Sequence, residues 1–310
     1  MSIIERVADL LGTVSQTRQK PSAEGEGTDA LELDLIERAT GDKSRRLDLP
    51  VDKDLGVVSM ATEEPARSTS RTARTLKVDR DRLRRQSMIT PDGERTPITE
   101  SFRRIKRQIL ANLANPEIDA PSANLVMVTS ALPGGGKTFC TINLAISIAQ
   151  EMDHTVLLVD ADVAKPSIPL ALGLKTEMGL MNVLLDRKIN LAEVLWKTDI
   201  DKLTLLPAGT ARHYTTEMLA SAAMRALLRE MAARYKDRIV IFDSPPLLAT
   251  SEASVLASQM GQIVVVVEAG KTSEAALKDA LSHIDSSKVT GLLLNKGEKP
   301  ALGYGYGGYG

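Results

Sequence analysis

The 310-residue chain is poor in several features, and each absence excludes a class of protein. It has a single cysteine, Cys140, so no intramolecular disulfide can form, and the composition suits a reducing compartment. We expect Cys140 to pack as a small hydrophobe without a redox role. The net charge of −1 gives no general case for binding nucleic acid. No apolar run approaches the roughly 18 residues of a membrane span, and no signal peptide pattern opens the chain. We therefore expect a cytoplasmic protein that reaches the membrane only through a partner.

Aromatic residues make up only 3% of the chain, but hydrophobic residues make up 43%, which is enough for a globular core. Two N-terminal segments differ from the rest. Residues 1–14 have the apolar spacing of an amphipathic helix, which either docks on another protein or packs back on the body. Residues 15–98 are rich in charged, Ser, Thr and Pro residues, and their apolar periodicity is fragmentary. Such a segment buries too little apolar surface to offset its ordering entropy, so we predict a largely disordered linker arm.

A clear helical pattern runs over residues 99–115, with Thr99 as its expected N-cap. One face is apolar and suits packing against the body. Another face carries three charged residues at intervals of three, Glu100, Arg103 and Lys106. Two interpretations remain open for them: local ion pairs along the helix, or a contact between subunits.

Residues 124–149 have the order strand, glycine loop, helix. The loop ALPGGGKT (131–138) follows a buried strand pattern and precedes apolar residues at helical spacing, which is the context of a phosphate-binding P-loop. Its amides would surround phosphates, Lys137 would contact the β- and γ-phosphates, and the Thr138 hydroxyl would ligate Mg²⁺. One departure from GxxxxGK[ST] is Ala131 at the first position. The expected nucleotide contacts are Pro133, Gly134, Gly135, Gly136, Lys137, Thr138 and Phe139.

Carboxylates end two further apolar runs. Asp160 and Asp162 follow HTVLLV, and Asp243 follows RIVIF. Because ligands of α/β sheets bind at the carboxyl ends of the strands, these side chains would face the nucleotide. Mg²⁺ beside phosphates explains why carboxylates should follow buried strands.

The remaining segments alternate between strands and helices. We predict strands at 202–206, 262–268 and 289–295, two short helices within 178–195, one helix from Thr216 to Tyr235 and another from Thr272 to about Asp285. Continuous apolar strands indicate an α/β protein of the P-loop NTPase fold, with a mostly parallel sheet covered by helices on both faces. This domain spans residues 99–296. Asn295 ends the last strand, where it either reads the base edge of the nucleotide or forms a turn.

The last residues, 297–310, form a glycine-rich tail that holds three of the five tyrosines, Tyr304, Tyr306 and Tyr309. The tail is either an aromatic adhesive segment or a set of phosphoryl acceptors. From Asn295 to Tyr309 it spans at most roughly 46 Å when extended and about 20 Å as a coil. We therefore predict phosphorylation in trans, at the site of a neighbouring subunit.

Together these residues resemble the bacterial tyrosine kinases of exopolysaccharide synthesis, the BY-kinases, and in particular their soluble, exosortase-associated autokinases. The resemblance covers about residue 83 to the C-terminus. ALPGGGKT corresponds to the family's Walker A motif, VLLVDAD to its Walker A′ motif and IVIFDSPP to Walker B. Walker A′ with its two aspartates is the most specific of these.

The resemblance implies an ATP- and Mg²⁺-dependent protein-tyrosine autokinase. Its catalytic residues would be Lys137, Asp160 and Asp162, with Asp160 or Asp162 as the proton acceptor, and its metal ligands Thr138, Asp160 and Asp243. The family's ExxRxxR motif of ring assembly corresponds to Glu100, Arg103 and Lys106. The resemblance also implies a membrane activator of the chain-length-determinant type and a protein-tyrosine phosphatase as partners, and no nucleic acid.

At two positions the residue differs from the one that a known family carries: Ala164 differs from the BY-kinases, and Leu132 differs from the MinD and ParA ATPases. The arginine that commonly follows Walker A′ is replaced by Ala164, next to Lys165, which lacks a bidentate fork. The extra lysine of MinD and ParA ATPases is replaced by Leu132. The alternatives are thus an ATPase switch of the MinD/ParA type, which Leu132 argues against, and a catalytically weak assembly scaffold, which Ala164 keeps open.

Overall fold

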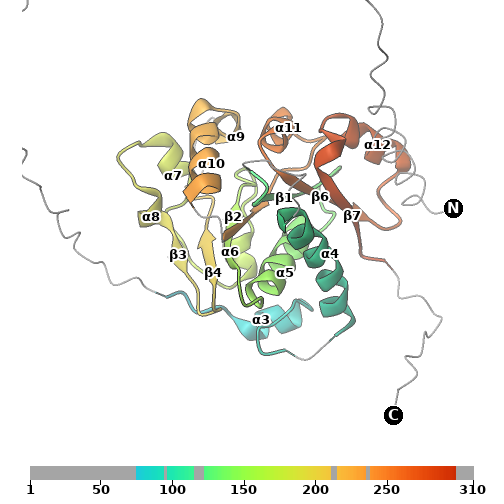
Figure 1. Ribbon diagram of the computed structural model, residues 1–310, viewed down its shortest axis with the longest axis horizontal. Helices are drawn as coiled ribbons and strands as arrows, with labels where there is room; N and C mark the ends of the chain where they lie inside the picture. The colour runs from blue at the N-terminus through green and yellow to red at the C-terminus, as the bar shows by residue number, and fades with distance from the viewer. Residues whose placement is uncertain (1–74, 94–95, 115–121, 211–214, 235–237, 298–310) are drawn as a thin grey trace, which may run out of the picture. The chain divides into compact units, whose positions relative to one another are not determined.

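The computed structural model describes residues 75–93, 96–114, 122–210, 215–234 and 238–297 (Figure 1). The helix expected at 1–14, most of the linker arm and the tyrosine tail lie outside these described residues. No helix in the described part is both long and apolar enough to cross a membrane.

A seven-stranded sheet forms the centre of the described chain, in the order β3-β4-β2-β5-β1-β6-β7. All neighbouring strands run parallel except the short pair β3–β4. This confirms the expected mostly parallel sheet. Its strands are β1 (Leu125–Ser130), β2 (Thr155–Asp160), β3 (Trp196–Lys197), β4 (Leu203–Leu206), β5 (Arg238–Asp243), β6 (Gln262–Glu268) and β7 (Val289–Asn295).

Helices cover both faces of the sheet, as the sequence predicted. Successive strand residues point to opposite faces, so Val126 and Val128 join one hydrophobic cluster while Leu125 and Met127 join the other. The first cluster is covered by α3 (Arg80–Arg85), α4 (Pro97–Ala114), α5 (Lys137–Ala149) and α6 (Ile168–Ala171). The second is covered by α7 (Leu180–Leu185), α8 (Leu191–Val194), α9 (Thr215–Leu219), α10 (Ala222–Arg234), α11 (Ser251–Ser258) and α12 (Glu274–Ser282).

The linker ends before residue 98, earlier than predicted. Helix α3 is capped by Asp79, whose carboxylate accepts from the Arg82 amide at 2.8 Å. Leu83 is fully buried, and Val78 and Ile89 join the same core cluster. The Ile89 amide donates to Asn143 on α5 at 2.6 Å. The sequence did not reveal this because a six-residue helix shows less than two turns of periodicity.

Several helix boundaries also differ from those predicted. α4 begins at Pro97, a favourable first position, two residues before Thr99. The helix predicted from Thr216 to Tyr235 is two helices, because the Ser221 hydroxyl accepts from the Met224 amide and starts a new one. Ser273, and not Thr272, caps α12, which ends at Ser282. The Thr272 hydroxyl instead accepts from the Glu268 amide at 3.0 Å. At the starts of α10 and α12, a serine hydroxyl that accepts from a backbone amide sets the boundary.

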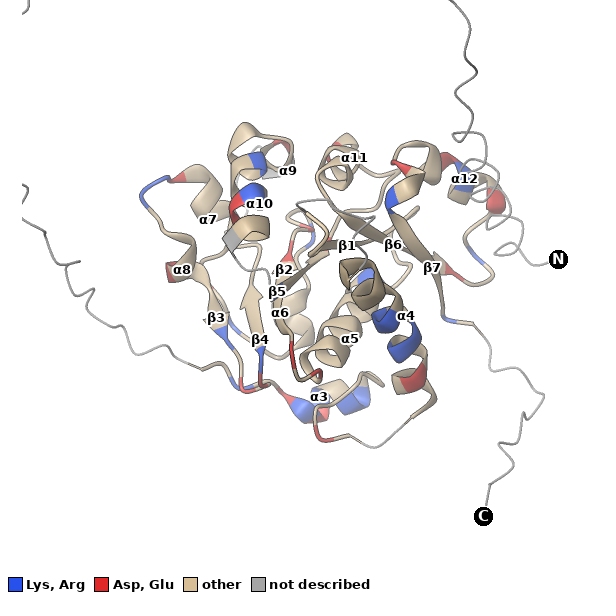
Figure 2. Cartoon of the chain, viewed as in Figure 1, with Lys and Arg blue, Asp and Glu red and all other residues tan. Residues whose placement is uncertain are grey.

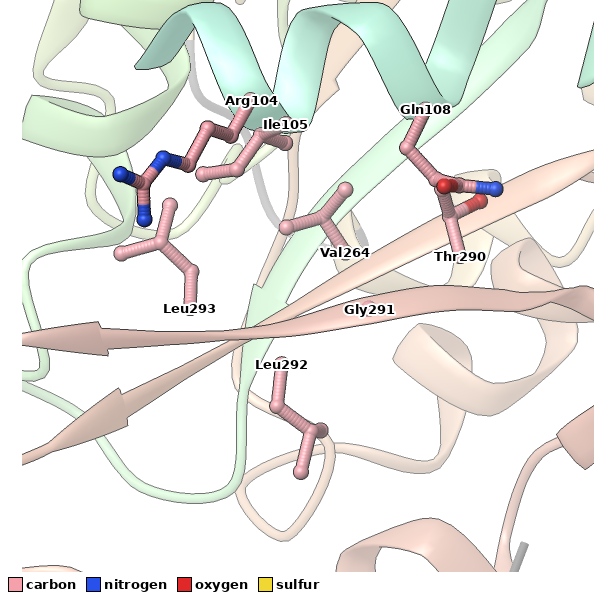
Figure 3. A pocket seen from close by; sticks show the side chains of 8 residues that line it. All are labelled: Arg104, Ile105, Gln108, Val264, Thr290, Gly291, Leu292 and Leu293. Atoms are coloured by element: carbon pink, nitrogen blue, oxygen red, sulfur yellow. The ribbon is translucent and has the colours of Figure 1, made fainter. Parts of the chain in front are cut away.

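A groove of about 220 Å³ runs between α4 and the edge of the sheet (Figure 3). Arg104, Ile105 and Gln108 form its helical wall, and Val264 and Leu293 rise from β6 and β7 toward them. In Figure 2 the Lys and Arg positions of α4 are coloured blue. Of these, Arg104 and Arg107 are exposed, whereas Lys106 is buried.

Candidate nucleotide and metal site

The loop between β1 and α5 adopts a conformation that requires glycine at two positions. Gly134 and Gly136 both have φ of +88°, in the left-handed region. A Cβ on Gly134 would meet nothing, whereas a Cβ on Gly136 would lie 2.1 Å from the Asn295 Nδ2 atom. Gly136 is also the N-cap of α5, so the helix begins directly at Lys137. The loop thus presents the N-terminus of a buried helix, which favours anions.

Lys137 is buried beside the second Walker A′ carboxylate. Its Nζ lies 3.4 Å from the Asp162 Oδ2 atom, and both side chains are nearly enclosed. The other oxygen of Asp162 accepts from the Lys165 amide at 3.3 Å. The lysine predicted to contact phosphates is therefore paired with a carboxylate of the same site.

Thr138 and Asp243 meet at the ends of α5 and β5. The Thr138 hydroxyl donates to Asp243 at 2.5 Å. The Ser167 hydroxyl lies 2.8 Å from the Thr138 hydroxyl. Thr141 lies 3.3 Å from the other oxygen of Asp243. Burial raises the pKa of Asp243 to about 6, while the Thr138 hydrogen bond and the charge of Lys137 oppose this rise.

Asp160 lies directly beside Asp243, because the two residues are register partners on β2 and β5. Its Oδ2 accepts from the amides of Ser167 and Ile168, each at 3.0 Å. Its Oδ1 is buried and has no hydrogen-bond partner. Burial, followed by the charge of Asp243, raises the pKa of Asp160 to about 8. A carboxylate oxygen in this position calls for a cation or a proton.

These groups fit Mg²⁺. In the described part of the chain, no three His, Cys, Asp or Glu residues are arranged to hold a metal by themselves. Mg²⁺ does not need such a cage, because it commonly binds one or two carboxylates together with waters and phosphate oxygens. The unpartnered oxygen of Asp160, the Asp243 carboxylate and the Thr138 hydroxyl supply that kind of donor set.

The end of β7 lies against the phosphate loop. Asn295 Nδ2 donates to the Gly135 carbonyl at 2.9 Å, so its amide binds the loop rather than forming a turn of its own. The next residue, Lys296, has φ of +59°, and its Nζ donates to the Gly134 carbonyl at 2.8 Å. Sequence reasoning missed Lys296, Ser167 and Thr141. No local signal marked them, since their roles depend on which strands are neighbours.

Three other residues that the sequence analysis singled out differ in their burial, and Cys140 alone is fully enclosed, as predicted. The Phe139 side chain is partly buried and packs against the cluster beneath α5, so any contact of this residue with the nucleotide would come from its backbone amide. Cys140 is buried, and burial raises the pKa of its thiol to about 12, as a small structural residue requires. Ala164, at the family's arginine position, is exposed in the loop after β2.

The three charged residues of α4 do not share one exposed face. Arg103 pairs with Glu100 at 2.6 Å, which is the local interpretation. Lys106 is buried instead, where it donates to the Ser147 carbonyl at 3.1 Å and pairs with Glu151. It therefore holds the C-terminal turn of α5, where a positive charge is favourable. Its own domain surrounds the Lys106 side chain, so of the three residues only Glu100 and Arg103 are accessible for the predicted subunit contact.

The chain is similar to known proteins in sequence and in fold. A family model described as an AAA domain matches residues 124–295. The chain is similar to tyrosine-protein kinase YwqD of Bacillus subtilis, with 36% identity over 66% of this chain and 84% of the relative. It is also similar to the succinoglycan biosynthesis transport protein ExoP of Rhizobium meliloti, with 33% identity over 71% of this chain but only 28% of ExoP.

Solved structures agree with these sequence matches. The crystal structure of the chimerical protein CapA2B2 superposes with a TM-score of 0.60 and 26% identity, over 69% of this chain and 91% of that one. The kinase domain of Escherichia coli tyrosine kinase ETK superposes with a TM-score of 0.56 and 24% identity, over 74% and 99% of the two chains. At 24% identity, the similarity to the ETK kinase domain shows only that the two chains share a fold.

Proposed function

Because the chain belongs to the bacterial tyrosine-protein kinases, with an AAA domain over residues 124–295, we propose that it phosphorylates tyrosines of its own tail, using ATP, and so regulates exopolysaccharide production or export. The observation that carries this proposal is the convergence of one lysine, one threonine and three aspartates beneath the glycine loop, with Asp160 Oδ1 left without a partner.

The chain's own residues provide the phosphate site. Loop amides and the start of α5 would surround the β- and γ-phosphates, and Lys137 would leave Asp162 to contact them. Thr138, Asp160 and Asp243 would hold Mg²⁺, which supplies neutralisation of phosphate charge when bound. Phosphoryl transfer depends chiefly on such alignment and charge compensation.

In the reaction, the tyrosine oxygen attacks the γ-phosphorus, a new O–P bond forms, and the bond to the β-phosphate oxygen breaks to release ADP. The phenol, with an ordinary pKa near 10, must also lose its proton. We assign the proton acceptor to Asp162, because it is slightly exposed and becomes free when Lys137 moves to the phosphates, whereas Asp160 is fully buried.

The acceptors would be Tyr304, Tyr306 and Tyr309 of a neighbouring copy in a ring. Exposed Glu100 and Arg103 remain as the contact residues of α4, next to the groove wall formed by Arg104. Each phosphate adds about −1.5 to −2 charges, so three per chain would repel one another and favour ring dissociation.

The size of one relative supports a proposal about partners. The match covers only 28% of ExoP, so in that protein the matched region is part of a longer chain. We propose that a separate membrane activator of the chain-length-determinant type recruits this chain to the inner face of the cell membrane. We also propose that a protein-tyrosine phosphatase reverses the reaction.

Mass spectrometry after incubation with Mg²⁺ and ATP tests the proposal, with and without the activator's cytoplasmic tail. We expect phosphate on Tyr304, Tyr306 or Tyr309 in the parent protein and none in Lys137→Met. ATP hydrolysis with an unmodified tail under both conditions would refute the kinase and favour an ATPase switch.

Transfer in trans needs a mixing experiment. The Lys137→Met chain, whose tail is intact, is incubated with a chain whose three tail tyrosines are phenylalanine. Phosphate on the Lys137→Met tail supports transfer between chains. An unmodified tail in the mixture, alongside normal labelling of the parent, would mean transfer in cis.

A further inference from the structure

Two adjacent residues at the end of β7 each donate a hydrogen bond to a carbonyl of the phosphate loop. Asn295 Nδ2 lies 2.9 Å from the Gly135 oxygen, and Lys296 Nζ lies 2.8 Å from the Gly134 oxygen. These two carbonyls belong to consecutive peptide units. The side chains therefore hold two successive peptide planes of the loop.

The direction of these bonds decides where the loop amides point. In a trans peptide the C=O and the next N–H point in opposite directions. The Gly134 carbonyl points toward Lys296, so the Gly135 N–H of the same peptide unit points away from Lys296. Likewise, the Gly135 carbonyl points toward Asn295, so the Gly136 N–H points away from Asn295. A glycine-rich loop needs such restraint, because glycine adopts many backbone conformations with little preference.

Lys296 is itself held in place. Its Nζ lies 3.1 Å from Glu268 Oε1, at the end of the neighbouring strand β6. Glu268 is largely enclosed and also pairs with Lys271 at 2.8 Å. The backbone carbonyl of Asn295 accepts from the Ala269 amide at 2.9 Å, which fixes the end of β7 against β6. The ammonium group therefore has a defined position between an anion and the loop.

We propose that Lys296, oriented by Glu268 and acting together with Asn295, is a positioning residue that aims the Gly135 and Gly136 amides at the phosphates. This rests on the proposed function, since it assumes that the loop binds a nucleotide. Asn295 then acts on the phosphate end of the nucleotide through the loop, and not on the base.

The test is calorimetric binding of Mg-ADP and of Mg-pyrophosphate, which has no base, to the full chain and to Lys296→Met. Lys296 is half exposed, so water partly replaces its charge-assisted hydrogen bond when the side chain is removed. We expect Kd to rise roughly three- to tenfold, and by the same factor for both ligands. The Asn295→Ala variant should show the same equality.

Lys271→Met is the matched control. Lys271 pairs with the same Glu268 oxygen but is 74% exposed, and this ion pair does not involve the phosphate loop. The Lys271→Met variant should bind both ligands with Kd values within about twofold of those of the parent. Lys296→Arg should bind them more tightly than Lys296→Met but less tightly than the parent. Circular dichroism of each variant checks that it folds.

Kinetics separate a positioning role from a structural one. Because the loop holds phosphates before and during transfer, Lys296→Met should raise the KM for ATP with little change in kcat. Equal Kd values for Lys296→Met and the parent would overturn the proposal, and so would a loss in Asn295→Ala confined to Mg-ADP. If the parent binds both ligands but labels no tyrosine, only the kinase assignment fails.

Discussion

The Thr138 hydroxyl lies 2.5 Å from a carboxylate oxygen of Asp243, although 105 residues separate the two in the chain. Thr138 lies in the first turn of α5 and Asp243 ends β5, and β5 pairs with β1, the strand that leads into the loop. A short hydrogen bond to a buried carboxylate is strong. In this state the threonine is thus already directed at the position where a metal ligand is needed.

Thr138→Val should weaken the metal-dependent binding of nucleotide while it preserves the shape of the side chain. The valine has a methyl group in place of the hydroxyl, so Asp243 loses its shortest partner and the metal loses a donor. We expect kcat/KM to fall by a factor on the order of 10². Thr138→Ser keeps the hydroxyl and should remain within about fivefold. A Mg²⁺ titration of nucleotide binding measures the difference; equal titrations for serine and valine would contradict the assignment.

Stability of the metal-free protein should depend on the buried carboxyls. Burial raises the pKa of Asp160 to about 8 and that of Asp243 to about 6, from an ordinary 3.8. The folded state then binds more protons than the unfolded chain, so the free energy of unfolding falls as pH rises above about 4. The contribution of Asp243 is lost through pH 6, and that of Asp160 through pH 8.

Urea unfolding in EDTA between pH 5.5 and 8.5 measures this dependence. Asp160→Asn should lessen the fall in stability above pH 6.5, because the asparagine does not titrate. A variant whose stability declines with pH as steeply as that of the parent would show that Asp160 is already ionised in the folded protein.

Two glycines of the loop should respond differently to alanine. Both have φ of +88°, which disfavours alanine by about 1–2 kcal/mol. Only at Gly136 does the added Cβ also collide with Asn295. We therefore expect Gly134→Ala to lower the free energy of unfolding by about 1 kcal/mol and Gly136→Ala by about 2–4 kcal/mol. Thermal unfolding of the two variants checks the order, and a larger loss at Gly134 would contradict it.

Substitutions of Lys106 and of Arg103 should have different effects: the first should lower the stability of the fold, and the second should affect assembly. Lys106→Met leaves the Ser147 carbonyl without its donor and Glu151 without its partner, and should lower stability by about 1–3 kcal/mol. Arg103→Ala removes only an exposed ion pair and should change stability by less than about 0.5 kcal/mol.

Light scattering gives the complementary measurement on the same variants. If α4 forms the ring contact, Arg103→Ala should shift the protein toward monomer at fixed concentration. An unchanged distribution for Arg103→Ala, together with one for Glu100→Ala, would remove α4 from the interface.

Leu83→Ala tests whether the segment before residue 98 belongs to the folded domain. Leu83 is fully buried in the cluster beneath α5. Truncation of such a residue leaves a cavity and typically costs about 2–4 kcal/mol. Chemical denaturation of the purified variant provides the value. A change below about 0.5 kcal/mol would mean that this residue contributes nothing to the core.

The sequence alone determined the features that depend on near neighbours in the chain. The strand, loop and helix around Lys137 follow from apolar periodicity and from glycine's conformational freedom, and both are legible within about 25 residues. The aspartates Asp160, Asp162 and Asp243 were predictable because each follows an apolar strand, and parallel strands present their carboxyl ends at one edge.

The tertiary structure alone decided which of these ends meet. Pairing of β2 with β5 sets Asp160 beside Asp243, and pairing of β6 with β7 brings Lys296 to Glu268 and to the loop. Burial likewise took Lys106 from its expected surface role into a contact with α5. Strand order and burial arise from the packing of the whole core, so they cannot be predicted from the residues next to a given position in the sequence.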